Sequence, residues 1–375
     1  VFYITMNLSY WEYKTWLSNI DFTIVGSGIV GLNCAYYLSK KYPKAKILIL
    51  EKGILPQGAS TKNAGFACFG SISEIVSDLK SHTEEEVVGL VRNRWEGIQL
   101  LRNTLGDSEI DFQQLGGHEL FLEKDINLFD ECYEAMGDVN KLLETVYGEG
   151  VYYLQHNNFN FGRIHNNYIS SRFEAQINTG AMMNSLLSLV RRSGANILNS
   201  VEVTSFEDGR DSVKVCTNQF DFKTRKLIIA TNGFANQLLD QEVKPARAQV
   251  LITKPINNLK IKGTFHLDEG FYYFRNIENR ILLGGGRNLD FKTEETSEFG
   301  QTELIQNQLE AMLHEIILPS TEFQIEHRWS GIMGIGNKKK PIVKQLSDNL
   351  LCGVRLGGMG IAIGSLVGKN LADLS

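Results

Sequence analysis

Three glycines near the start of the chain have the spacing of a turn that binds the diphosphate of a dinucleotide. The segment GSGIVG (26–31) directly follows the apolar run FTIV and directly precedes the helical pattern LNCAYYLSKKY. In such a strand–turn–helix unit, the first glycine permits a tight turn, the second lets the backbone approach phosphate, and the third lets the helix pack on the strand. The residues expected to bind here are Gly26, Gly28, Ile29, Val30 and Gly31.

An acidic residue closes the next predicted strand. Glu51 ends the apolar run KILILE, twenty residues after Gly31, and Lys52 follows it. A carboxylate at this position accepts a hydrogen bond from a ribose hydroxyl and repels a 2′-phosphate. We therefore predict a site for NAD or FAD with Glu51 and Lys52 among its binding residues.

Small side chains dominate the segment GASTKNAGFACFGS (58–71), where ten of fourteen residues are Gly, Ala, Ser, Thr or Cys. Such a segment lets the backbone pass close to a flat group, and its hydroxyl and amide side chains offer short hydrogen bonds. An NAD enzyme would instead continue with alternating strands and helices, so this run favours FAD. A glycine-rich surface turn is the alternative interpretation. The flavin-binding residues predicted here are Ser60, Thr61, Asn63, Ala64 and Gly65.

Composition restricts the class of protein. The 375 residues are 43% hydrophobic and carry a net charge of −5, which is typical of a globular chain and gives no general attraction to nucleic acid. The five cysteines are scattered, without a C-x-x-C pair or a nearby histidine, so neither a metal site nor a disulfide framework is predicted. No apolar run reaches membrane-spanning length, and no signal pattern opens the chain. We expect a cytoplasmic protein and assign no role to the residues before Met6.

The predicted elements give an α/β fold. Strand–helix–strand patterns fill 21–52, and residues 173–194 have the pattern of a helix. Residues 247–291 have the pattern of consecutive strands. A strand at 349–354, a glycine-rich turn and a helix close the chain.

Several segments together resemble the D-amino-acid oxidase/glycine oxidase (DAO) superfamily of FAD-dependent oxidoreductases. In chain order they are FTIVGSGIVGLNCAYYL, ILILEKG, GASTKNAGF, FEAQINTG, KLIIATNGFA, YYFRNIENRILLGGGR, RWSGIMG and RLGGMGIAIGSLVGKNLADL. The resemblance implies a Rossmann-type FAD-binding lobe interleaved with an α+β substrate lobe that has a large antiparallel sheet. It places the FAD lobe at 20–80, 155–245 and 325–375, and the substrate lobe at 81–154 and 246–324.

The resemblance also implies further contacts to FAD. The turn around Met359 opens the closing helix toward the flavin N1/O2 edge, where the helix dipole would stabilise reduced flavin. A helix cap alone is the competing interpretation of that turn. The residues implied are Val203 at the adenine, Thr231, Asn232 and Gly233 on the diphosphate side, and Gly331, Met333, Gly357, Gly358, Met359, Gly360 and Ile361 on the flavin side.

The family strand that offers a tyrosine to the substrate carboxylate corresponds to GFYYFR (270–275), which implies Tyr272 and, beside it, Arg275 as catalytic-site residues. A sheet with an aromatic face and a surface arginine is the alternative. Met333 stands where the glycine oxidase branch has a clamping arginine. Two further departures are Leu282 in place of a lysine associated with oxygen activation, and Gly331 and Ile332 where sarcosine oxidases have the cysteine that links the flavin covalently.

These departures predict non-covalent FAD, an altered acid clamp and an unknown electron acceptor. The expected reaction oxidises the C–N bond of an amino acid or secondary amine by hydride transfer to flavin N5. Two alternatives stay open, because a fold does not fix a substrate. One is a 2-hydroxy-acid dehydrogenase of the same superfamily, which would release no ammonia or amine. The other is a flavin-binding protein without amine oxidase activity.

Overall fold

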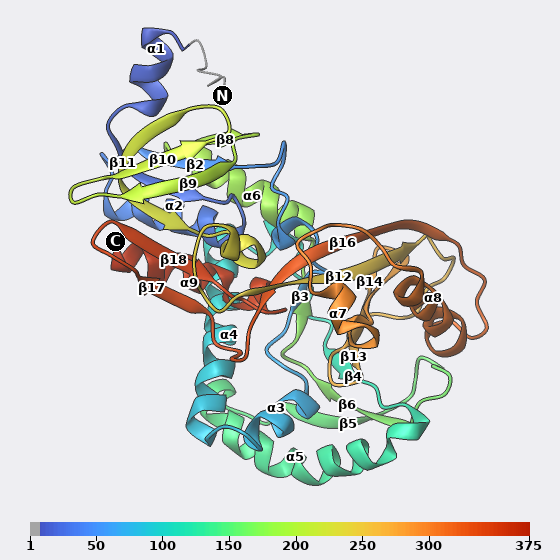
Figure 1. The fold of residues 1–375 in the computed structure, drawn as a ribbon. Coiled ribbons are helices and arrows are strands. Elements are labelled where there is room, and N and C mark those ends of the chain that lie inside the picture. Colours follow the sequence, from blue (N-terminus) through green and yellow to red (C-terminus); the bar gives the residue numbers. More distant parts are fainter. Residues whose placement is uncertain (1–7) are drawn as a thin grey trace.

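The computed structural model describes residues 8–375, so the residues before Met6 lie outside the described part of the chain. Two large sheets organise it, one in the upper part of Figure 1 around β11, β2 and β8, and the other around β12, β14 and β13. Helix α4 (Glu84–Leu105) runs down one side of the molecule in this view, from the first sheet toward α5 (Ile126–Tyr147). This arrangement confirms the predicted α/β fold with a large second sheet.

The first sheet has a parallel centre. Strand β1 pairs in parallel with β2 and with β11, and β2 and β11 continue in parallel to β8 and β18. The runs IDFTIV and ILILE are almost wholly buried, as expected of central strands covered on both faces. In sheet order the strands are β17 (Ile342–Gln345), β18 (Leu350–Val354), β11 (Asp221–Ile229), β1 (Ile20–Val25), β2 (Ile47–Glu51) and β8 (Asn196–Asn199). Strand β10 (Val213–Thr217) also pairs with β11, and β9 (Val203–Asp208) pairs with β10.

Two glycine contacts bring the helices beside this sheet close together. A Cβ at Gly368 of α9 (Gly360–Leu374) would lie 2.6 Å from Cβ of Asn33 on α2 (Ile29–Lys41). A Cβ at Gly97 of α4 would overlap the carbonyl oxygen of Ala362 on α9. The absence of side chains at these positions therefore sets where the N-terminus of α9 lies.

The second sheet is antiparallel except where β4 and β13 pair in parallel. Its apolar face packs under α8 (Glu303–Met312) in a core that includes Phe265, Phe274 and Leu309. The opposite face meets the small-residue segment that follows β2. In order the strands are β16 (Ile325–Ile335), β12 (Lys244–Thr253), β15 (Arg280–Gly285), β14 (Tyr272–Ile277), β13 (Thr264–Leu267), β4 (Gly117–Glu119), β6 (Asn167–Ser171) and β5 (Tyr152–His156).

Some predicted elements differ from those observed. The helix expected over 173–194 is shorter, because its first residues form the short strand β7 (Ala175–Gln176) and α6 (Thr179–Arg192) begins at the Asn178 cap. The domain boundaries stay a prediction. Strands β6 and β16 lie inside the predicted FAD lobe, yet they pair within the second sheet.

None of the helices in residues 8–375 is long and apolar enough to cross a membrane.

Candidate functional site

One cavity of about 670 Å³ opens between the carboxyl ends of β1 and β2 and the second sheet. Every predicted cofactor residue except Gly31, Thr61 and Gly233 lines it, so segments far apart in the chain meet there. The lining residues predicted from sequence are Gly26, Gly28, Ile29, Val30, Glu51, Lys52, Ser60, Asn63, Ala64, Gly65, Val203, Thr231, Asn232, Gly331, Met333, Gly357, Gly358, Met359, Gly360 and Ile361.

The three exceptions support the cavity from behind. A Cβ at Gly31 would overlap the carbonyl oxygen of Gly26, so this glycine lets α2 pack against the turn. A Cβ at Gly233 would lie 2.6 Å from the carbonyl oxygen of Met333, so Gly233 permits close packing on β16. The Thr61 hydroxyl donates to the carbonyl oxygen of Pro56 at 2.8 Å. These residues shape the site without lining it.

Glu51 is held in a fixed position at the end of β2. Its carboxylate accepts from the backbone N–H of Ser27 at 3.1 Å, from the Ser27 hydroxyl at 2.8 Å and from the backbone N–H of Gly53 at 3.0 Å. The side chain is buried and lines the cavity. A carboxylate anchored in this way is preorganised to accept from a ribose hydroxyl.

The polar side chains of the small-residue segment mainly build the loop itself. The amide of Asn63 donates to the carbonyl oxygens of Ala59 and Ser60, each at 3.0 Å, and accepts from the backbone N–H of Gly65 at 2.8 Å. The Ser60 hydroxyl accepts from the backbone N–H of Ile29 at 2.9 Å, which ties the segment to the start of α2. The sequence predicted both a backbone that approaches the flavin and short hydrogen bonds from these side chains. In the structure the side chains bond within the loop and to the start of α2, and their contacts to flavin stay a prediction.

Two features test whether this cradle fits FAD. The Thr231 hydroxyl lines the cavity, and its oxygen is buried without a hydrogen-bond partner in residues 8–375. Helix α9 begins at the cavity with no side-chain cap on its N-terminal N–H groups. A Cβ at Gly357 or Gly360 would meet no atom within 4 Å, which leaves room above the helix terminus. The unpaired donors and the open space lie in the same cavity as Glu51, the residue expected to bind ribose. This combination fits a flavin dinucleotide.

Of the two adjacent tyrosines of β14 (Tyr272–Ile277), the structure places Tyr273 at the cavity and the predicted Tyr272 in the core. Successive side chains of β14 point to opposite faces of the sheet. Tyr272 therefore packs with Phe274 in the core under α8, whereas Tyr273 lines the cavity. Burial raises the pKa of Tyr273 to about 12, so its hydroxyl stays protonated and can donate a hydrogen bond.

Arg275 lies on the same face as Tyr273 but does not line the cavity. Its side chain is buried, and Nη1 donates to the carbonyl oxygens of Gly65 at 3.0 Å and Ile177 at 2.8 Å. Burial lowers the pKa of Arg275 to about 10. The arginine expected to bind an acid group instead fixes the loop before α6.

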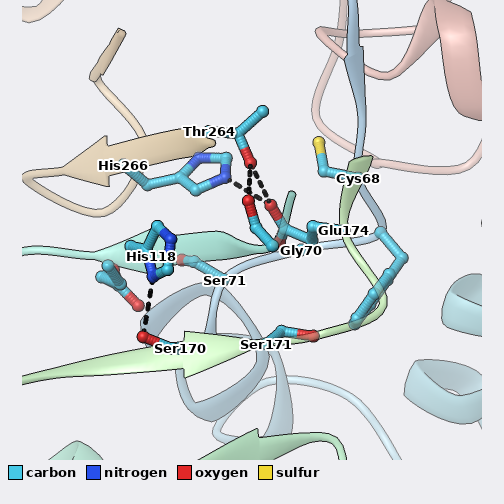
Figure 2. Close-up of polar contacts among 12 residues, drawn as sticks. Cys68, Gly70, Ser71, His118, Ser170, Ser171, Glu174, Thr264 and His266 are labelled. Carbon is cyan, nitrogen blue, oxygen red and sulfur yellow. Dashed lines mark hydrogen bonds and ion pairs between the residues drawn. The ribbon is translucent and has the colours of Figure 1, made fainter. Parts of the chain in front are cut away.

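Sequence reasoning missed a buried cluster beside Tyr273 (Figure 2). His266 on β13 is paired across strands with Tyr273, and its Nε2 shares a hydrogen bond of 2.9 Å with the Glu174 carboxylate. Thr264 donates to the same carboxylate at 3.1 Å, and the Glu174 side chain is only 2% exposed. Burial by itself lowers the pKa of His266. The charge and hydrogen bond of Glu174, together with the charges of Glu119 and Glu74, outweigh this effect and raise the pKa to about 9. His266 is therefore an imidazolium at neutral pH, and it lines the cavity.

Cys68 belongs to the same cluster. Its sulfur, a carboxylate oxygen of Glu174 and a ring nitrogen of His266 all lie within 4.8 Å of one another. Burial raises the pKa of the Cys68 thiol well above its usual range, and the sulfur lies 3.9 Å from that of Met359. The three residues come from separate segments, and no local pattern signals their proximity.

Comparisons with known proteins agree with this geometry. A family model described as FAD dependent oxidoreductase (DAO) matches residues 21–374. The probable oxidoreductase OrdL of Haemophilus influenzae is 19% identical over 383 residues, which cover 96% of this chain and 83% of that protein. Glycine oxidase from Geobacillus kaustophilus superposes with a TM-score of 0.75 at 18% identity, covering 94% of each chain. L-proline dehydrogenase from P. horikoshii gives 0.73 at 17% identity, covering 95% of this chain and 93% of that one. At these identities the solved structures show the fold.

Proposed function

Because the chain belongs to the DAO family of FAD-dependent oxidoreductases, we propose that it oxidises the C–N bond of a small amino acid or secondary amine. One observation carries the proposal. The Rossmann turn, the small-residue segment and the start of α9 share a single cavity with Tyr273 and His266 of the second sheet. A cofactor cradle and a polar face suited to a small substrate therefore lie opposite each other. Two of the superposed proteins, a glycine oxidase and an L-proline dehydrogenase, are named for substrates of this class, which supports the proposal.

We infer that FAD is held without a covalent bond. Of the five cysteines, all within the described residues, only Cys68 lines the cavity. Its raised pKa leaves the thiol protonated, and the thiolate is the nucleophilic form. Gly331 and Ile332, which also line the cavity, carry no group able to form such a bond.

The residues of the chain would contribute orientation and charge stabilisation. Glu51 would hold the ribose, and the Thr231 hydroxyl would face the diphosphate. The uncapped N–H groups at the start of α9 would stabilise negative charge in reduced flavin. Bound FAD supplies the hydride acceptor, N5 of its ring. The face formed by Tyr273, His266 and Phe66 would orient the substrate and exclude water.

His266 limits how the substrate amine can lose its proton. As an imidazolium below about pH 9, it donates hydrogen bonds and cannot act as a base. The amine would therefore react from its neutral form, bound as such from solution. The electron acceptor stays unidentified, and a cytoplasmic location stays a prediction.

The mode of cofactor binding is tested by acid precipitation of the purified yellow protein. Flavin released into the supernatant is the expected result. Flavin retained in the pellet would show a covalent link and overturn the non-covalent assignment.

The reaction is tested by product analysis with an artificial electron acceptor. One ammonia, or one amine from an N-alkyl substrate, should appear for each two electrons passed on. Turnover of a 2-hydroxy acid with no nitrogen released would favour the dehydrogenase alternative.

A further inference from the structure

Arg94 is a buried cation that lines the cavity and has no acidic partner in the part of the chain that the structure describes. Arg94 of α4 is 4% exposed and contributes to the cavity wall. Its Nη1 donates to the carbonyl oxygen of Phe69 at 2.6 Å. Nε is fully enclosed and has no hydrogen-bond partner in residues 8–375. A guanidinium has five N–H donors, so most of the binding capacity of Arg94 is unused by the protein.

Glu74, a carboxylate that lines the same cavity, is committed to other contacts. Glu74 accepts from the backbone N–H of Ser71 at 3.2 Å as part of the capping box of α3 (Ile72–Leu79), and it lies 3.8 Å from Nζ of Lys339. Among the described residues, no carboxylate lies within ion-pair distance (4.0 Å) of Arg94. A buried charge without a counter-ion is unfavourable unless a ligand supplies one.

Two cations, Arg94 and the His266 imidazolium, lie at this end of the cavity, and Glu174 and Glu74 are carboxylates whose charges act there. Burial and the charges of Glu174 and Glu74 raise the pKa of the Cys68 thiol, and the charge of Arg94 opposes them with a smaller effect. Cys68 adjoins His266. Glu174 already balances the imidazolium of His266 and is shielded behind it. The other expected acid-binding positions are unsuited, because residue 333 is Met and Arg275 is bound to two carbonyl oxygens.

We propose that Arg94 binds the carboxylate of the substrate. The inference rests on the proposed function and narrows its substrate class to amino acids or N-alkyl amino acids with a free carboxylate, in preference to simple amines. Arg94 comes from α4, whereas the position that the resemblance implied is on β16. The residue that binds the carboxylate would therefore lie on a different element of the fold from the one that the resemblance implied.

The first test measures how simple carboxylates without an amine perturb the visible spectrum of the FAD-bound protein. Acetate, propionate and benzoate should give saturable changes with the wild type. For the carboxylate that the wild type binds most tightly, Arg94→Gln should lower the affinity by on the order of tenfold or more, since a charge-assisted hydrogen bond is lost. Arg92→Gln is the matched control, because Arg92 lies on the same helix, is exposed and loses the same charge. Equal affinity in Arg94→Gln and wild type would overturn the proposal.

Arg94→Lys and the wild type provide tests that do not depend on how well Arg94→Gln folds. The lysine variant should keep part of the carboxylate affinity, because it keeps the charge and loses the planar fork. The wild type should reduce its flavin faster with an amino acid than with the amide of the same amino acid. Equal reduction by both would overturn the carboxylate role while leaving amine oxidation intact.

A flavin contact would give a different result. If Arg94 served only the negative edge of reduced flavin, Arg94→Gln would lower the flavin reduction potential and leave carboxylate affinity unchanged. That outcome would overturn the proposal. A carboxylate site should instead show its main effect in the binding titration.

Discussion

At the scale of single residues, the face of β14 decides which side chains can touch a substrate. Tyr273 lines the cavity, and Tyr272 packs in the core beneath it. Two consecutive tyrosines in a strand do not show which of them faces the ligand. Side-chain alternation requires only that the two point to opposite faces of the sheet. The sequence therefore predicted the strand but not which of its two tyrosines lines the cavity.

Replacing each tyrosine with phenylalanine separates the two positions. Tyr273→Phe removes a protonated hydroxyl from the cavity wall and should lower kcat/KM by about tenfold, the cost of one lost hydrogen bond. Tyr272→Phe should change kcat/KM by less than about twofold. Steady-state kinetics on both variants check this, and a larger loss in Tyr272→Phe would restore the original assignment.

The protonation of His266 makes the free energy of unfolding depend on pH. Its pKa of about 9 in the folded protein exceeds the ordinary 6.5, so folding strengthens proton binding. This stabilisation is complete below about pH 6.5 and is lost as the pH rises through 9. The shift corresponds to roughly 3 kcal/mol at most. The charged groups facing His266 are Glu174 behind it, Glu119 on β4 and Glu74 on α3, all of which raise its pKa.

Urea unfolding between pH 7 and 10 measures this contribution. The wild type should lose stability across that range more steeply than His266→Gln, which has no ring to titrate. His118, whose pKa burial lowers to about 4, is neutral throughout and does not interfere. If the free energy of unfolding changed with pH equally in the two proteins, the His266–Glu174 pair would not bind its proton tightly.

At the scale of elements, contacts between helices set the position of the α9 N-terminus. Gly97 of α4 touches the backbone of α9 so closely that a Cβ would overlap the Ala362 carbonyl. Helix α9 in turn opens onto the cavity at Gly360. Packing far from the ligand therefore places the N–H groups proposed to face the flavin.

Gly97→Ala should displace α9 and cost about 1–3 kcal/mol of stability, as overpacking does. It should also lower FAD affinity, because the helix terminus moves. Gly89→Ala on the same helix is the control, since a Cβ there would meet nothing within 4 Å and should stabilise the helix by about 0.5–1 kcal/mol. Chemical unfolding and flavin titration of both variants give the comparison. Equal stability of the two would contradict the packing account.

Local patterns predicted the elements that local interactions determine. The strand–turn–helix at Gly26, the end of β2 at Glu51 and the start of α9 all lie where the sequence placed them. The Cys68–Glu174–His266 cluster was not predicted, because its members become neighbours only when β13 and the segments around residues 68 and 174 converge. Arg94 was missed for a similar reason, since within α4 it has the appearance of an ordinary helical arginine.

At the scale of the whole molecule, the cavity depends on how the two sheets meet. The first sheet supplies the cofactor cradle, and the second supplies Tyr273 and His266. Single-sequence patterns predicted both sheets, but they could not give the pairing that places β6 and β16 in the second one. Which residues face each other across the cavity is a property of this tertiary arrangement.

The most direct test of amine oxidation is the visible spectrum of the FAD-bound protein after anaerobic mixing with matched substrates. The set would contain small amino acids, their N-methyl derivatives and the 2-hydroxy acids of the same carbon skeletons. If the protein oxidises C–N bonds, flavin absorbance should bleach with at least one amino acid or N-methyl amino acid and not with the corresponding hydroxy acid. Bleaching by the hydroxy acid alone, or by no member of the set, would contradict it.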